Sequence, residues 1–112
     1  GNLSNCRTFL TLPLDDGHID GATVDSEGGY WLALVAAGKV RRYRPDGLID
    51  RDFALPCSNP TKPAFGGADM ATLFVTSTRL RLRSDLPGTE ANGGVFALKP
   101  GFSGIAETAF AD

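Results

Sequence analysis

The chain has 112 residues, of which 42% are hydrophobic, and its 13 acidic and 11 basic residues leave a formal charge of −2. This length accommodates one domain with a core of its own. The balanced charge provides no broad basic field, and no apolar run approaches the ~20 residues that span a bilayer. We therefore expect neither a nucleic-acid-binding nor a membrane protein. With no secretion signal and two cysteines, Cys6 and Cys57, a cytoplasmic chain with free thiols is expected, and a Cys6–Cys57 disulfide is the alternative.

Short apolar runs separated by glycine, proline and acidic residues predict an all-β chain. In the first half, strands are expected over 7–12, 22–24, 30–35, 39–44 and 48–55. In the second half, they are expected over 63–65, 72–77, 94–98 and 105–110. The run YWLALV at 30–35 is apolar throughout, which is typical of a strand covered on both faces.

The second half of the chain repeats the plan of the first. Phe74 comes 43 residues after Trp31, and both lie in apolar strands. Four-stranded propeller blades recur at about 40–45 residues, so this spacing fits a β-propeller. The third strands, from Val40 and Val95, are 55 residues apart, and we interpret residues 78–92 as an inserted loop. Because a blade is apolar on both faces, two or three blades need cover from a missing N-terminal part or from self-association.

Several motifs, in order along the chain, resemble those of the regucalcin/gluconolactonase family, which includes luciferin-regenerating-enzyme-like proteins. The segment DGATVDSEGGYWLA at 20–33 is similar to the family's PDG-hydrophobic-x-hydrophobic-D-x-E-G-x-hydrophobic-W-hydrophobic-A segment. Further similar segments are LSNCR at 3–7, GKVRRY at 38–43, AFGG at 64–67, LFVTS at 73–77 and NGGVFAL at 92–98. The resemblance implies about two and a half C-terminal blades of a six-bladed β-propeller. Residues 1–16 would form outer strands of one blade, 17–56 one blade and 57–112 the last blade.

Members of this family hydrolyse sugar lactones and bind a divalent cation in the central channel. The resemblance implies that Asp20 is one metal ligand, from a late blade, and that it helps to activate the attacking water as a base. Ca²⁺ is the expected cation, with Zn²⁺, Mg²⁺ or Mn²⁺ as alternatives, and it would polarise the lactone carbonyl. The family's Glu and Asn ligands belong to earlier blades, so no residue of this chain is assigned to them.

Single residues near this motif allow other interpretations. Asp20 directly before Gly21 also fits a simple tight turn. His18, the one histidine, is expected to be an exposed loop residue, with a substrate contact as the alternative. Lys62 stands where the family has a small or polar residue, and it would add positive charge beside the cation if its loop faces the channel. Ile19 replaces the family's proline before Asp20, which changes the stiffness of the backbone there.

Other charged residues are expected to be solvated. Asp25 and Glu27 fall in the turn before the apolar strand. The arginines at 41, 42 and 44 are interspersed with apolar or aromatic residues along the next strand, as on the solvated face of a strand. Two functions remain open at this point. The chain is part of a metal-dependent sugar lactonase, or it is a non-catalytic propeller fragment that acts as a scaffold or binding module.

Overall fold

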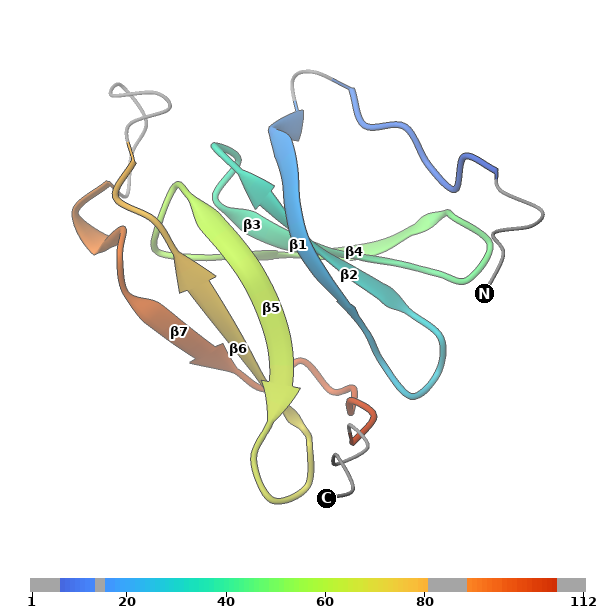
Figure 1. Ribbon diagram of the computed structural model, residues 1–112. Coiled ribbons are helices and arrows are strands. Elements are labelled where there is room, and N and C mark those ends of the chain that lie inside the picture. Colours follow the sequence, from blue (N-terminus) through green and yellow to red (C-terminus); the bar gives the residue numbers. More distant parts are fainter. Residues whose placement is uncertain (1–6, 14–15, 81–88, 107–112) are drawn as a thin grey trace, which may run out of the picture.

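The computed structural model describes residues 7–13, 16–80 and 89–106, and within them the chain forms two antiparallel sheets side by side (Figure 1). The first sheet has the strand order β1 (His18–Val24), β2 (Tyr30–Val35), β3 (Lys39–Tyr43) and β4 (Ile49–Ala54). The second sheet has the order β5 (Pro60–Gly66), β6 (Thr72–Ser77) and β7 (Val95–Leu98). Besides these strands, the described residues include the short 3₁₀ turn η2 (Thr89–Ala91). The all-β prediction is confirmed.

Tight turns connect the strands of the first sheet. The β3–β4 connection contains the turn Pro45-Asp46-Gly47, with Gly47 at φ +87°. The side chain of Asp46 accepts a hydrogen bond from the Leu48 amide at 3.0 Å, which closes the turn. In the described part of the chain, no helix is long and apolar enough to cross a membrane.

The core lies on both faces of β2, as the apolar run predicted. Because side chains alternate along a strand, Trp31 points to one face while Leu32 and Leu34 point to the other. Between the two sheets, the fully buried apolar cluster consists of Trp31 and Val40 from the first sheet and Leu73 and Val75 from the second. On the opposite face, Leu32 and Leu34 pack with Tyr43. The first face therefore joins the two sheets into one core.

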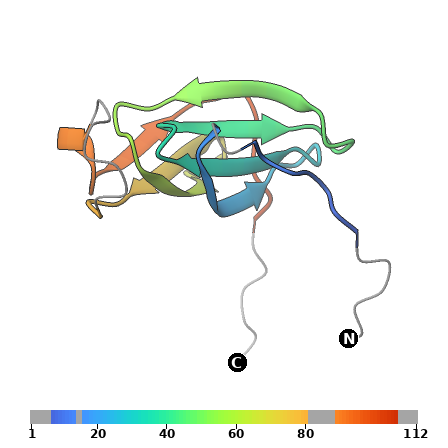
Figure 2. The same ribbon diagram turned by 90° about the horizontal axis from the view of Figure 1, so that it is seen from above.

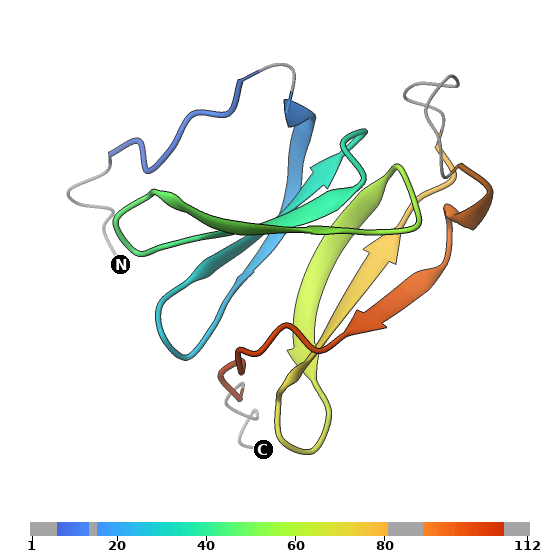
Figure 3. The same cartoon turned by 180° about the vertical axis from the view of Figure 1, so that it is seen from behind.

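Residues 7–13, expected to include a strand over 7–12, carry no strand in the structure (Figure 3). Among the described residues, this segment belongs to neither sheet and pairs with no strand. Its apolar side chains still find partners, since Leu10 and Leu12 pack against Leu32, Leu34 and Tyr43. The alternating sequence therefore predicted which side chains of this segment make apolar contacts. It did not predict whether the segment forms the backbone hydrogen bonds that a strand requires.

The C-terminal described segment connects the two sheets. Leaving β7, residues 100–106 pass from the second sheet back to the first (Figure 2). Gly104 forms a β-bridge with Asp25, and the Ser103 carbonyl accepts a hydrogen bond from the Ser26 amide at 2.8 Å. The Gly104 amide donates to the Met70 carbonyl in the β5–β6 turn, also at 2.8 Å. This segment thus joins a turn of each sheet.

Candidate functional site

Asp20 lies inside strand β1, so the tight-turn interpretation is wrong. The register of β1 against β2 shifts between Ile19 and Ala22, which places Asp20 and Gly21 in a β-bulge. A bulge bends a strand and redirects a side chain, and bulges are common beside active sites. The Asp20 side chain is exposed, and it has neither a hydrogen bond nor an ion pair with any residue that the structure describes. It is a carboxylate available to a ligand.

Gly21 permits a close approach between β1 and β5. A Cβ atom added at Gly21 would lie 2.7 Å from the carbonyl oxygen of Thr61, well inside van der Waals contact. The side chain of Lys62 crosses the same glycine, and its Nζ atom donates a hydrogen bond to the Ala22 carbonyl. The Asp-Gly pair therefore has two separate roles: Asp20 presents a carboxylate, and Gly21 removes the side chain that would keep the strands apart.

Asp20 lines a cavity of about 430 Å³ at the junction of the two sheets. The other lining residues come from both sheets and the segment after β6: His18, Ile19, Val35, Thr61, Thr78 and Leu80. His18, expected in a loop, is the first residue of β1 and shares this cavity with Asp20. No role was expected for Thr61 or Thr78, because local sequence does not show which residues of neighbouring strands and loops meet at one cavity.

The cavity lining includes one carboxylate, that of Asp20, and carboxylate oxygens suit hard cations. Thr61 and Thr78 add neutral hydroxyl groups to the lining. Ca²⁺ takes 6–8 oxygen ligands. Within the described ranges, no group of three or more His, Cys, Asp or Glu side chains could hold a metal ion. Asp20 is thus the one acidic side chain that lines this cavity among the residues that the structure describes.

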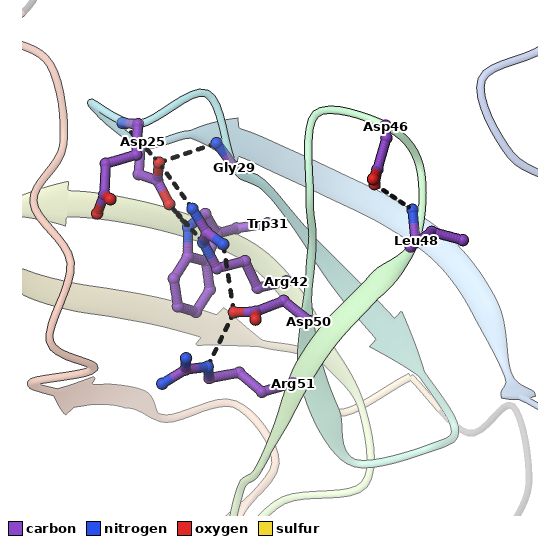
Figure 4. Close-up of polar contacts among 9 residues, drawn as sticks. Asp25, Gly29, Trp31, Arg42, Asp46, Leu48, Asp50 and Arg51 are labelled. Atoms are coloured by element: carbon purple, nitrogen blue, oxygen red, sulfur yellow. Dashed lines mark hydrogen bonds and ion pairs between the residues drawn. The ribbon is translucent and has the colours of Figure 1, made fainter.

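A second carboxylate, Asp25, is fully buried and saturated with hydrogen bonds (Figure 4). Its oxygens accept from Trp31 Nε1 at 2.7 Å, from Arg42 Nε at 2.7 Å, and from the Glu27 and Gly29 amides at 2.9 Å each. Burial acts to raise the pKa of Asp25, but these donors outweigh it and hold the pKa below its usual value. The expectation that Asp25 is solvated is wrong, whereas Glu27 is exposed as expected.

The arginines of β3 are also mostly buried, contrary to the sequence-based expectation. Arg42 lies between Asp25 and Asp50, and its guanidinium stacks 4.0 Å above the ring of Phe102 from the C-terminal segment. Arg41, on the other face, pairs with Asp52 at 2.7 Å and with Asp16 at 3.0 Å. Asp52 and burial act in opposite directions on the pKa of Arg41, and the net effect is a rise. Of the arginines at 41, 42 and 44, only Arg44, which follows β3, is exposed.

These buried pairs hold the structure together and leave Asp20 as the free carboxylate of the β1 region. Every oxygen of Asp25 already accepts hydrogen bonds, so Asp25 has little capacity left for a ligand. Cys57 is buried, and desolvation raises the pKa of its thiol, which keeps it protonated and unreactive. Cys57 is a free thiol in the structure, and Cys6 lies outside the described residues.

Two antiparallel sheets side by side, with an unpaired carboxylate in a bulge at their junction, define an all-β protein with a site between its sheets. The chain belongs to the SMP-30/gluconolactonase/LRE-like family, whose model matches residues 1–79. It is 43% identical over 96 residues to 6-deoxy-6-sulfogluconolactonase of Pseudomonas putida, covering 85% of this chain and 33% of the relative. It is 37% identical over 112 residues to L-arabinolactonase of Azospirillum brasilense, covering 99% of this chain and 37% of the relative.

A solved structure of similar fold is regucalcin of Agrobacterium tumefaciens, described as a calcium-binding protein. The two share 37% sequence identity with a TM-score of 0.71, over 81% of this chain and 31% of that protein. The predicted family resemblance is therefore confirmed. The chain spans about a third of the length of the curated relatives it matches.

Proposed function

We propose that these 112 residues form the C-terminal blades of a six-bladed propeller that hydrolyses sugar lactones. Residues 17–56 would be one blade and 57–112 the last, with 1–16 contributing to the outer strands of the blade before them. The side-by-side inner strands β1 and β5 support this arrangement, since blades of a propeller converge at their inner strands. The lactonases among the relatives support the substrate class.

Asp20 is the residue that carries the proposal. It is a cavity carboxylate with no partner among the described residues, and a bulge presents it beside the neighbouring inner strand. In the proposed site it is a ligand of a divalent cation, with Ca²⁺ as the first candidate and Mg²⁺, Mn²⁺ or Zn²⁺ as alternatives. The cation supplies Lewis acidity toward the lactone carbonyl. In the proposed site, the same carboxylate also acts as a base that accepts a proton from the attacking water.

The test uses the full-length protein that carries these residues, with Asp20→Asn and Asp46→Asn as matched variants. Asp46 is an exposed turn residue, so its amide variant controls for loss of one negative charge. Calcium affinity by isothermal titration calorimetry and hydrolysis of D-glucono-1,5-lactone should both fall steeply for Asp20→Asn only. A folded Asp20→Asn protein with wild-type calcium affinity and wild-type turnover would refute the assignment.

The second function, a non-catalytic scaffold or binding module, makes the opposite prediction for the parent protein. It expects no cation-dependent lactone hydrolysis, with or without Asp20. Turnover that chelation abolishes and added Ca²⁺ restores therefore separates the two hypotheses. Absence of turnover at every tested cation favours the scaffold.

A further inference from the structure

Thr61 occupies a second β-bulge that faces the same cavity as Asp20. The register of β5 against β6 shifts between Pro60 and Lys62, so Thr61 is the extra residue on β5. The bulge of β1 lies beside it, because Gly21 contacts the backbone of Thr61. Figures 1 and 3 show β1 and β5 next to each other, and the two strands are in contact. Two neighbouring inner strands thus each carry an irregularity where they line one cavity.

The hydrogen-bond pattern determines what the Thr61 hydroxyl can offer. Thr61 Oγ1 lies 2.7 Å from Thr76 Oγ1 on β6, and Thr76 Oγ1 can also donate to the Lys62 carbonyl at 3.4 Å. A hydroxyl has a single hydrogen to donate. Either hydroxyl can donate its hydrogen across the 2.7 Å contact between the two threonines. In both cases the Thr61 oxygen keeps a lone pair, so Thr61, which lines the cavity, can accept a hydrogen bond there.

The rest of the cavity wall is a mixture of apolar and polar groups. Ile19, Val35 and Leu80 provide apolar surface, while Asp20 and Thr61 provide oxygen atoms from opposite strands. A sugar ring has the matching chemistry, since its C–H groups suit apolar contacts and its hydroxyls are donors. An unsubstituted lactone ring has the carbonyl but no hydroxyl that could donate to Thr61.

We propose that Thr61 binds substrate by accepting a hydrogen bond from a ring hydroxyl of the lactone, an inference that rests on the proposed lactonase function. It thereby selects polyhydroxylated lactones over unsubstituted ones. The carbonyl of the same ring lies toward Asp20, and Thr61 takes no part in the bond-breaking step. A site built to hydrogen-bond a hydroxyl discriminates against an analogue that lacks it, because its polar group is then left unpaired.

The test compares Thr61→Val and Thr61→Ser in the full-length protein, with D-glucono-1,5-lactone and δ-valerolactone as substrates. The two lactones share a six-membered ring and differ in their hydroxyl groups. One neutral hydrogen bond is worth about 0.5–1.5 kcal/mol, so Thr61→Val should raise KM for the hydroxylated lactone by about 2–10-fold. Its KM for δ-valerolactone and its kcat for both should stay at wild-type values, and Thr61→Ser should restore the hydroxylated substrate.

A second variant tests whether the contact with Thr76 positions the Thr61 hydroxyl. Thr76→Val leaves Thr61 in place but removes its hydroxyl partner, so a smaller rise in KM is expected, again only for the hydroxylated lactone. Equal losses on both substrates, or no change on either in both variants, would overturn the role of Thr61 while leaving the lactonase function intact. Wild-type protein that hydrolyses neither lactone would instead overturn the proposed function, and the role of Thr61 with it.

Discussion

Asp25 shows how much one buried carboxylate can organise at the scale of a residue. It ties the turn before β2 to the indole of Trp31 and to the guanidinium of Arg42 on β3. Arg42 then holds Phe102, so the ion pair reaches the C-terminal segment. The pair is desolvated on both sides, since Asp25 is 0% and Arg42 6% exposed. Removing one partner would strand the other as an uncompensated buried charge.

We therefore predict that Asp25→Asn lowers the free energy of unfolding by roughly 3–5 kcal/mol, the range for breaking a buried pair. The matched control is Asp46→Asn, which alters an exposed pair with Arg44 and should cost about 0–1 kcal/mol. Urea unfolding followed by Trp31 fluorescence measures both. Equal midpoints for the two variants would contradict the central role of Asp25.

The lowered pKa of Asp25 also predicts acid sensitivity. Its ordinary value is 3.8, and a folded pKa below this means that the unfolded chain binds the proton more readily. The stabilisation is thus fully present above about pH 5 and declines as pH falls through 3.8 toward the folded pKa. Urea midpoints should drop between pH 5 and pH 3, and the drop should be smaller in Asp25→Asn. Parallel pH profiles in the two proteins would rule out this contribution.

At the scale of elements, Gly21 controls how closely β1 and β5 approach. We predict that Gly21→Ala destabilises the protein by about 1–3 kcal/mol, because the new methyl group overlaps the Thr61 carbonyl and must displace a strand. Gly94→Ala is the matched control, since its added Cβ would lie no closer than 3.3 Å to any neighbour. Thermal unfolding at one fixed protein concentration compares them. A Gly21→Ala protein as stable as Gly94→Ala would show that the close approach is dispensable.

Strand positions could be predicted from the sequence because they depend on local patterns. The apolar run of β2 and the Pro45-Asp46-Gly47 turn each specify their structure over a few residues. Burial of the polar residues could not be predicted in this way. Arg42 follows another arginine in a short strand, a pattern that favours a solvated side chain, and the ring that covers it, Phe102, comes 60 residues later in the chain.

The same distinction between local and long-range features applies to the candidate site. Asp20 could be identified because it belongs to a recognisable motif, although only the structure excluded a tight turn at this position. The bulges on β1 and β5 could not be foreseen, since a register shift depends on the partner strand rather than on local sequence. Thr61 and His18 were for that reason not placed beside Asp20.

At the scale of the whole molecule, the first sheet keeps an apolar surface with little cover. A cavity of about 540 Å³ on this face is lined by mostly apolar side chains, including Phe9, Ile19, Val24 and Tyr30. Ile19 is 53% exposed and Val24 44% exposed. In the proposed propeller, the preceding blade would pack on this face, whereas in an isolated chain nothing else in the described residues covers it.

We predict that the 112-residue chain produced alone self-associates through this face. Light scattering coupled to size-exclusion chromatography should give a mass above the 11.8 kDa of one chain, rising with concentration. Val24→Lys should shift the distribution toward monomer, while Val95→Lys, on the exposed second sheet, should not. A stable monomer at all concentrations would contradict the need for cover.

The C-terminal segment also bears on the order in which the molecule assembles. Its contacts with the first sheet, from Gly104 to Asp25 and from Phe102 to Arg42, join residues that are distant along the chain. Each hairpin closes a short loop, whereas these contacts close a long one and are entropically slower to form. The two sheets can therefore take shape before the segment locks them together. The segment is therefore expected to lower the rate of unfolding more than it raises the rate of folding.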